Sequence, residues 1–359
     1  MNNRLQHLRE ALAENEIDGI FISQAENRYY LSGFHGTAGY LFITENAAIL
    51  ATDFRYTEQA VSQAPDFEIL RIGAGLGDWF SGMVSEHRVK RLGFESSDVS
   101  YQFFNLLKAS LEKKNLDTTL VPVCGVVEKL RTIKEKEEIE FTGKAAAIGD
   151  RALEAVERLI TPGMTEAAIA WELEKRLRED GSGPLPFEII VASGPAAALP
   201  HHLPSDRTVG EGETIVIDMG ARYNGYSSDL TRTVCAGEPD DYYKKIYGTV
   251  LDAQTAALAI IKGGITGHDA DAAARTVIQN AGYGEDFGHG LGHGVGLVVH
   301  EAPRLSPGSE DVLKDGMIFS VEPGIYLSGW GGVRIEDVVL VTENGVEVLT
   351  KAPKDPIVA

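Results

Sequence analysis

The chain has 359 residues, of which 43% are hydrophobic and 24% are charged, and these proportions are ordinary for a globular protein with enough apolar side chains for two cores. Its 53 acidic and 33 basic residues give a formal net charge of −20, which argues against nucleic acid or an anionic membrane as a standing partner. Residues 1–12 predict an amphipathic helix without the apolar centre of a signal peptide. The sequence also lacks any run of about 18 apolar residues, so we expect a cytoplasmic protein.

The first part of the chain, residues 1–125, alternates helical and extended patterns. Helices are expected up to about residue 16 and over residues 55–60 and 101–114, and strands over residues 18–23, 39–44, 47–52, 67–71 and 91–95. This alternation indicates an α/β domain with a mixed sheet. Residues 29–38, which contain His35, are the segment of this domain with the most functional promise. The alternative for this segment is a plain structural turn.

A charged connector is expected over residues 126–136, and a second domain over residues 137–359. The connector leads into a long helix through Leu159, and we assign its charges to a solvated helical face. Pro162 and Gly163 end that helix, and the following residues, 165–166, begin another. The two cysteines, Cys124 and Cys235, fall in different predicted domains, so we interpret them as separate thiols rather than a disulfide.

Two acidic residues flank a predicted β-hairpin in the second domain. The extended segments 213–223 and 226–234 enclose Asn224-Gly225, a dipeptide typical of a two-residue hairpin loop. In this register position 218 faces position 231, and side-chain alternation places Asp229 on the same face as Asp218, on the diagonal. Carboxylates so placed repel each other unless a cation lies between them, so the pair predicts a metal site.

A second acidic pair follows a similar pattern. Residues 317–326 predict a strand that carries Glu322 and ends at Pro323-Gly324, and residues 333–341 predict another strand beyond a glycine-rich turn at 329–332. Alternation places Arg334 and Glu336 on one face of the later strand.

Between the two pairs lies a glycine-rich run, residues 288–296, that carries His289 and His293, and His300 follows it. The run does not fit the dinucleotide-binding pattern. We interpret it as a place where backbone and metal come close, and a metal-scavenging tract or a flexible loop is the alternative. Each acid taken singly could be a turn or cap residue, but four carboxylates and one imidazole in this order indicate a site for two divalent cations.

The order of these motifs resembles the dinuclear metallopeptidases with the pita-bread fold, a family that contains prolidases, aminopeptidases P and methionine aminopeptidases. The matching motifs are Ile217–Gly220, Ser228–Thr233, His289–His293 with His300, Val321–Gly324 and Arg334–Asp337. The resemblance covers essentially the whole chain and implies an α/β N-terminal domain followed by an α+β pita-bread catalytic domain. The N-terminal domain is similar to that of prolidases and creatinases, which disfavours methionine aminopeptidase. No ligand position is substituted, which argues against a non-metal relative such as creatinase.

The resemblance also implies roles for individual residues. The implied metal ligands are Asp218, Asp229, His293, Glu322 and Glu336, of which Asp229 and Glu336 would bridge both ions. The implied catalytic residues are His201, His289, His300 and Glu322. His202 is an alternative to His201, although the spacing favours His201. Manganese is the first choice of metal, with cobalt, iron or zinc as alternatives, because such a donor set suits all four.

Four further residues are candidates for contact with the substrate. Arg304 matches an arginine that prolidases use to hold the carboxylate of a dipeptide's proline, a task suited to a guanidinium fork, and a solvated surface arginine is the alternative. Arg334 is placed near the substrate but is expected to brace Glu336 more than to bind a peptide. Phe187 is a possible wall for a proline ring or a core residue. In a homodimer, His35 would help limit substrate length in the partner's site.

The implied reaction is hydrolysis of the Xaa-Pro bond in dipeptides by a metal-bridging hydroxide, with Glu322 moving the proton and His300 polarising the carbonyl. The expected partners are therefore small peptides with proline in the second position. An aminopeptidase P acting on longer peptides is the alternative within the family. A catalytically silent peptide-binding protein on the same fold is the alternative from another class.

Overall fold

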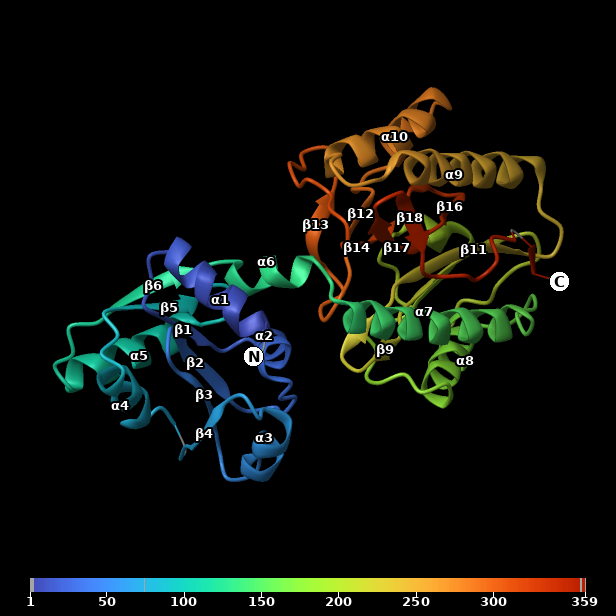
Figure 1. Cartoon of the computed structure of the whole chain (residues 1–359). Coiled ribbons are helices and arrows are strands. Elements are labelled where there is room, and N and C mark those ends of the chain that lie inside the picture. Colours follow the sequence, from blue (N-terminus) through green and yellow to red (C-terminus); the bar gives the residue numbers. More distant parts are fainter. Residues whose placement is uncertain (1–2, 74, 356, 359) are drawn as a thin grey trace. The chain divides into compact units, whose positions relative to one another are not determined.

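The chain folds into two compact units that divide between Arg131 and Thr132. The computed structural model describes residues 3–73, 75–355 and 357–358, and Figure 1 shows the whole chain. The division falls inside the segment predicted as a connector, residues 126–136, whose first half forms helix α6 (Val126–Thr132). None of the helices in the described part of the chain is long and apolar enough to span a bilayer.

The first unit is built on a six-stranded sheet with the order β4-β3-β2-β1-β5-β6. Its strands are β1 (Gly19–Ile22), β2 (Tyr40–Thr44), β3 (Ala48–Thr52), β4 (Glu68–Arg71), β5 (Arg91–Glu95) and β6 (Thr119–Val123). Strand β1 pairs antiparallel with β2 and parallel with β5, so the predicted mixed sheet is confirmed. The helices besides α6 are α1 (Asn3–Glu14), α2 (Ala25–Ser32), α3 (Thr57–Gln63), α4 (Trp79–Glu86) and α5 (Tyr101–Lys113).

Apolar side chains cover both faces of strand β1. Phe21 packs in one cluster with Phe80 of α4 and Leu107 of α5, while its neighbours Ile20 and Ile22 are fully buried as well, and side chains alternate faces along a strand. The sequence did not predict α2, α4 or β6. The segment 29–38 is therefore not a plain turn throughout, because its first four residues belong to α2, which ends at Gly33 with φ 76°.

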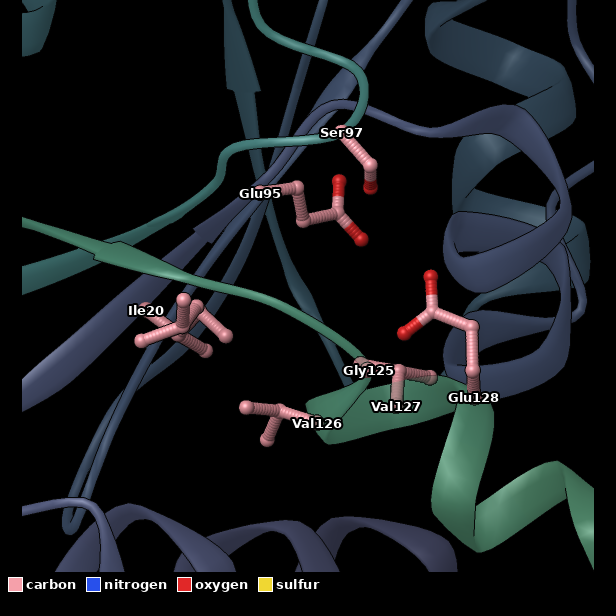
Figure 2. A pocket seen from close by; sticks show the side chains of 8 residues that line it. Ile20, Glu95, Ser97, Gly125, Val126, Val127 and Glu128 are labelled. Atoms are coloured by element: carbon pink, nitrogen blue, oxygen red, sulfur yellow. The ribbon is translucent and has the colours of Figure 1, made fainter. Parts of the chain in front are cut away.

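A pair of carboxylates in the first unit has a structural explanation. Figure 2 shows Glu95 and Glu128 pointing toward each other across a small pocket, which has no room for a water-sized molecule. Glu95 accepts hydrogen bonds of 2.7 Å from the backbone N–H groups of Ser23 and Gln24, at the start of α2. Glu95 thus satisfies donors at a helix N-terminus, which have no partner within the helix.

The second unit contains two helix-covered sheets. The first sheet has the order β19-β11-β8-β7 and the second has the order β13-β12-β14-β17-β18. The strands of the first are β7 (Ile190–Ser193), β8 (Thr214–Met219), β11 (Leu230–Ala236) and β19 (Ile357–Val358). Those of the second are β12 (Gly292–Gly294), β13 (Glu301–Leu305), β14 (Ile318–Val321), β17 (Asp337–Thr342) and β18 (Gly345–Val348).

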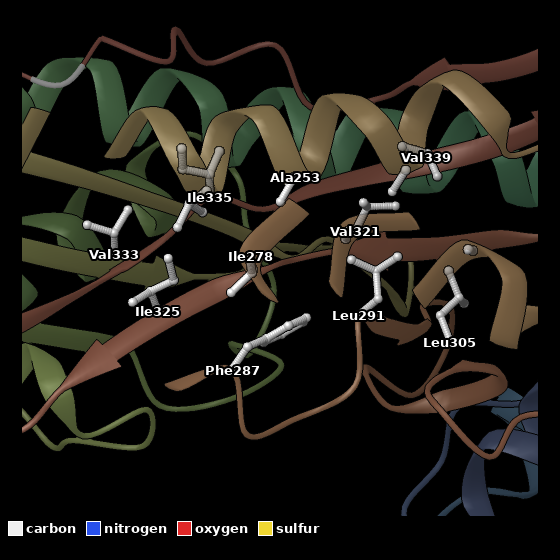
Figure 3. Close-up of a cluster of buried hydrophobic side chains, with 14 of the residues drawn as sticks. Ala253, Ile278, Phe287, Leu291, Leu305, Val321, Ile325, Val333, Ile335 and Val339 are labelled. Carbon is white, nitrogen blue, oxygen red and sulfur yellow. The ribbon is translucent and has the colours of Figure 1, made fainter. Parts of the chain in front are cut away.

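Each of these sheets shares a hydrophobic core with its own pair of helices. Helices α7 (Lys136–Glu157) and α8 (Glu166–Glu179) bury Leu153 and Leu173 in one cluster with Ile217 of β8. Helices α9 (Asp241–Ile260) and α10 (Gly267–Asn280) pack over the second sheet. Figure 3 shows Ala253 and Ile278 from these helices in the cluster that contains strand residues such as Val339. The short 3-10 helices are η1 (Gly194–Ala198) and η2 (Gly284–Asp286).

A small hairpin interrupts the chain between the two inner strands of each half. In the first half it consists of β9 (Arg222–Tyr223) and β10 (Tyr226–Ser227), and the loop residues Asn224 and Gly225 have φ values of 46° and 84°, as a two-residue turn of this kind requires. Thr231 pairs with Asp218 in the β8–β11 ladder. The hairpin and its predicted register are confirmed.

In the second half the small hairpin consists of β15 (Gly324–Leu327) and β16 (Gly331–Arg334). The sequence predicted a strand ended by Pro323-Gly324, and β14 does end just before them, at Val321. The prediction of one strand over 333–341 was wrong, because that segment breaks at Glu336 into β16 and β17. The N–H of Glu322 continues the β12–β14 pairing by donating to the carbonyl of Leu291 over 2.8 Å, whereas the N–H of Glu336 donates to that of Thr231, in the other sheet, over 3.1 Å.

The glycines around His293 make room for neighbouring backbone. A Cβ atom on Gly292 would lie 1.9 Å from the carbonyl oxygen of Ser320, and one on Gly294 would lie 2.0 Å from that of Ala302. We had attributed the run to a close approach of backbone to metal, but the approach that the structure shows is between β12 and its two neighbours in the sheet. The glycines fix the position of His293 by letting these strands close on it.

We expect Gly292→Ala to destabilise the second unit by at least about 2 kcal/mol, because backbone must move to accept the added methyl group. The matched control is Gly288→Ala in the same run, where an added Cβ meets nothing within 4 Å. Urea unfolding of both variants, stripped of metal with a chelator, measures the difference. Equal unfolding midpoints for the two variants would contradict this account of the glycine run.

Candidate metal centre

Of the five residues predicted as metal ligands, the four acids lie at or beside the ends of strands in the second unit, and the histidine lies within a short strand. Asp218 is the fifth residue of β8 and Asp229 immediately precedes β11. Glu322 immediately follows β14, and Glu336 lies in the break between β16 and β17. His293 is the middle residue of β12. Such positions join a rigid ladder on one side to backbone that is free to turn a side chain inward.

The structure brings these side chains together. Ligand atoms of Asp229, His293 and Glu336, all buried, lie within 4.8 Å of one another. Nε2 of His293 is 3.2 Å from Oε1 of Glu322 and 3.7 Å from Oδ2 of Asp229. Asp218 lies outside the group of three and is linked to it through Arg334, whose Nη2 donates to Asp218 Oδ2 over 2.7 Å.

Arg334 connects the acidic residues of the two halves. Its Nε donates to Oγ1 of Thr231 over 3.1 Å, and that hydroxyl donates to Oε2 of Glu336 over 2.6 Å. Its Nη1 donates to the hydroxyl of Tyr326 over 3.0 Å. Each nitrogen of the guanidinium therefore has a partner in the protein, and only 4% of the side chain is exposed. Arg334 thus contacts Asp218 directly and reaches Glu336 through Thr231.

The electrostatics of the protein atoms alone oppose ionisation of all the acids at once. Burial, and then repulsion from Glu336, Asp218 and Glu322, raises the pKa of Asp229 well above its usual range. Burial, and then Glu322 and Asp218, raises the pKa of Glu336 in the same way. Burial also disfavours the charged form of Glu322, but the hydrogen bond and charge of His293 hold its pKa at about 2. Additional positive charge at the centre would relieve this repulsion.

Two buried oxygen atoms at the centre lack a hydrogen-bond partner, and they fit a divalent cation. Oδ1 of Asp218 and Oε1 of Glu336 are buried, and no donor in the described residues reaches either of them. Leaving such atoms unpaired is costly unless another ligand satisfies them. Carboxylate oxygens with one imidazole form a donor set that divalent transition metals accept. The residues present therefore fit a metal centre.

The predicted catalytic histidines lie around this centre. The ring centroids of His293 and His300 are 4.3 Å apart. Burial lowers the pKa of His300, and the charge of His293 lowers it further, whereas that of Glu322 opposes the shift. Nε2 of His289 lies 2.9 Å from the Tyr326 hydroxyl.

The side chain of His202 lies away from the predicted ligands and contacts helix α8. Its Nε2 is 2.8 Å from the carboxylate of Glu166, which lies in the first turn of α8. The structure thus engages His202 in a structural contact and leaves His201 exposed.

The remaining candidates for substrate contact have distinct surroundings. Arg304 lies opposite His293 in the β12–β13 ladder, is exposed, and in the described chain its guanidinium has no hydrogen-bond or ion-pair partner. Phe187 is half-buried and packs beside Gly220, where an added Cβ would lie 2.8 Å from its ring. In the first unit, exposed His35 lies 2.6 Å from Nε2 of Gln63.

Sequence reasoning missed three polar residues that orient the site. Thr231 was placed opposite Asp218 but was given no role, although alternation puts its side chain on the same face as Asp229. Ser320 donates from its hydroxyl to Glu322 over 2.9 Å and accepts from the N–H of His293 over 3.1 Å. Tyr326 joins His289 to Arg334. Alternation along 318–322 puts Ser320 on the face of Glu322 and was the available signal for it.

We expect Asp229→Asn and Glu336→Gln each to weaken divalent-metal binding by more than about 100-fold, because even residues that merely orient metal ligands are worth about 10–100-fold in affinity. Elemental analysis after gel filtration, together with calorimetric titration of the metal, measures the loss. The control is Glu343→Gln, which removes an exposed carboxylate from the loop after β17. Metal content equal to that of the unmodified protein in both variants would contradict the assignment of this centre.

Comparisons with known proteins agree with this geometry. The model of metallopeptidase family M24 matches residues 140–343, and that of the creatinase/prolidase N-terminal domain matches residues 4–133. A Xaa-Pro dipeptidase of Pyrococcus horikoshii is 38% identical over 359 residues, covering 99% of each chain. A solved Xaa-Pro dipeptidase from Bacillus anthracis is 44% identical with a TM-score of 0.95, covering 99% of each chain.

A solved X-Pro aminopeptidase from Thermotoga maritima is 40% identical, with a TM-score of 0.89, and the match covers 97% of this chain and 99% of that one. The family resemblance and the two-domain fold class predicted from the sequence are thereby confirmed. Membership in this family implies a divalent metal ion, which is the kind of ligand that the buried acids require. The chain belongs to metallopeptidase family M24, with the pita-bread fold and a creatinase/prolidase N-terminal domain.

Proposed function

We propose that the protein hydrolyses the Xaa-Pro bond of dipeptides with two divalent metal ions held by Asp218, Asp229, His293, Glu322 and Glu336. The observation that carries this proposal is the buried group of donor atoms from Asp229, His293 and Glu336, in a chain whose relatives include proteins named Xaa-Pro dipeptidases. Four ionised carboxylates carry four negative charges, of which Arg334 offsets one. With the hydroxide that two such ions would hold, the remaining charge is −4, which two divalent cations balance and one does not.

The metal ions would supply an ionised water molecule near neutral pH, bridging them as hydroxide. The protein's own residues transfer the proton and stabilise the developing negative charge. Glu322, beside His293 on the edge of the group, takes a proton from the nucleophile and returns it to the leaving nitrogen. Manganese is our first choice of ion, because a carboxylate-rich set with one imidazole suits it.

Imidazoles around the centre stabilise the developing oxyanion. Burial lowers the pKa of both His289 and His300, so each is neutral near pH 7 and still carries one N–H donor. We assign His300 to the substrate carbonyl, because its ring lies 4.3 Å from that of His293. A donor aimed at the oxygen as it becomes negative stabilises the transition state more than the substrate. His201 and His289 line the same space.

Arg304 is our candidate for recognition of the dipeptide's carboxylate. It lies beside His293 in the sheet, is exposed, and has its guanidinium free within the described chain. A peptide longer by one residue would present its carboxylate further away, so this arginine favours dipeptides. Phe187 is proposed as the apolar wall for the proline ring.

A second candidate function is that of an aminopeptidase, which releases the first residue from longer Xaa-Pro peptides. The observation that favours it is the 40% identity to the solved X-Pro aminopeptidase. Both candidates use the same metal centre. We further propose cytoplasmic residence and a homodimer in which His35 limits substrate length.

A paired assay separates the two functions. Metal-stripped protein is restored with manganese, cobalt, iron or zinc in turn and is given an Xaa-Pro dipeptide and the tripeptide that extends it by one residue. We expect cleavage of the dipeptide at least about tenfold faster, because the dipeptide alone places its carboxylate at Arg304, and a charge-assisted hydrogen bond is worth about 1.5–3 kcal/mol. Cleavage of the tripeptide alone would reject the dipeptidase function.

Substitution of Arg304 tests the recognition of the carboxylate. We expect Arg304→Ala to raise KM for the dipeptide by about 10- to 100-fold with a smaller effect on kcat, because the interaction is present in both the bound substrate and the transition state. Arg304→Lys keeps the charge without the fork and should fall between the two. An unchanged KM in Arg304→Ala, measured by steady-state kinetics, would show that another group holds the carboxylate.

A further inference from the structure

The loop that carries His201 is closed by one buried carboxylate. Glu166, at the start of α8, is 0% exposed, and the groups that it binds lie at the two ends of the segment from Ser193 to Ser205. We propose that Glu166 is a positioning residue that sets His201 in place at the metal centre. The inference rests on the proposed function, since it gives His201 a part in that reaction.

Five hydrogen bonds support this role. Oε1 of Glu166 accepts from the backbone N–H and the hydroxyl of Ser193 over 2.8 and 2.7 Å. Oε2 accepts from the backbone N–H and hydroxyl of Ser205 over 3.1 and 2.7 Å, and lies 2.8 Å from Nε2 of His202. One carboxylate thus joins the end of strand β7, the end of the loop and the residue next to His201.

Glu166 is not needed for the usual task of an acid at the start of a helix. Thr165 is the N-cap of α8 and accepts from the N–H of Ala168. Although burial disfavours the charged form, hydrogen bonds from His202, Ser205 and Ser193 hold the pKa of Glu166 below its usual value. The ionised carboxylate accepts at both oxygens, which a glutamine side chain cannot do, because its NH2 group would meet another donor.

The other side of the loop rests on the strand that leads to the metal centre. A Cβ on Gly332 would lie 2.2 Å from the carbonyl oxygen of Ala197, and one on Gly331 would lie 2.9 Å from that of Gly194. Both glycines belong to β16, which ends at Arg334. The loop is therefore held between α8 and β16, so its position is defined relative to the acidic residues.

His201 lies in this loop directly before His202 and is exposed. Its charge is among those that lower the pKa of His300, whose ring centroid lies 4.3 Å from that of His293. His202, the next residue, takes the contact with Glu166. With His202 held by Glu166, the adjacent His201 stays exposed, and the proposed function assigns it to the substrate.

The test compares Glu166→Gln with Glu174→Gln. Glu174 lies on the same helix, and its carboxylate forms an exposed ion pair with Arg178. We expect Glu166→Gln to lower kcat for an Xaa-Pro dipeptide by about 10- to 100-fold, because a displacement of about 1 Å can cost that much. We expect metal content to be unchanged and KM to change less than threefold, whereas Glu174→Gln should behave as the unmodified enzyme.

A double-mutant comparison with His201→Ala distinguishes a positioning role of Glu166 from a general loss of stability. In a His201→Ala background, Glu166→Gln should cause little further loss, because residues that act through one another are not additive. His202→Gln, which keeps a donor for Glu166, should retain activity within about threefold, whereas His202→Leu should lose as much as Glu166→Gln. If Glu166→Gln does not fold, these two His202 variants still decide the question.

Hydrogen exchange of residues 194–204 tests the positioning without activity. We expect faster exchange in this loop alone for Glu166→Gln and no change for Glu174→Gln. Equal kcat and equal exchange in the two variants would overturn the inference, and so would a full additional loss in the His201→Ala background. Protein that is metallated yet inert toward every Xaa-Pro peptide would reject the proposed function instead, and the exchange measurement would still judge the role of Glu166.

Discussion

The arrangement of the catalytic unit depends on the repulsion among carboxylates that the fold forces into one buried space. Asp229 and Glu336 come from different sheets, yet their ligand atoms lie within 4.8 Å of each other and of His293. Burial makes the repulsion stronger, because water no longer screens it. The protein relieves a part of it with Arg334, which binds Asp218 directly and reaches Glu336 through Thr231. The remainder favours the binding of divalent cations.

The two halves of the second unit contribute to this centre in the same way. In each half, a pair of helices covers a sheet whose two inner strands are separated by a small hairpin, and the acids lie where these strands meet the hairpin. β9 and β10 follow Asp218 and precede Asp229, while β15 and β16 lie between Glu322 and Glu336. A hairpin at this point turns the backbone out of the ladder next to the acidic residues. The repetition explains why the ligands come in two pairs.

Local features of this architecture could be predicted from the sequence. Asn224-Gly225 specifies a two-residue loop by its own backbone preferences, and the loop fixes which residues face each other, so the pairing of Thr231 with Asp218 followed without tertiary information. The ordered set of acids and histidines similarly identified the family. Strands β1, β2, β3 and β5 of the first unit were clear because each is a short, nearly continuous run of buried residues.

Features that depend on distant backbone could not be predicted. The strand predicted over 333–341 breaks at Glu336, whose N–H donates to Thr231 of the other sheet, and nothing in the local pattern indicates a partner so far along the chain. The reason for Gly292 lies in the carbonyl of Ser320 on the adjacent strand. Glu166 was taken only as an acid at a helix start, because its partners are 27 to 39 residues away.

The separate cores of the two halves have a consequence for how the enzyme unfolds. Asp218 and Asp229 come from the half built on α7 and α8, and the other three acidic or imidazole ligands come from the half built on α9 and α10, so an ion bound among them ties one core to the other. The free energy of metal binding then stabilises the contact between the two halves rather than either core. Metal supply in the cell would then set the rate of turnover. It would also set how strongly the two halves resist separation, and hence how well the protein resists proteases that cleave the separated halves.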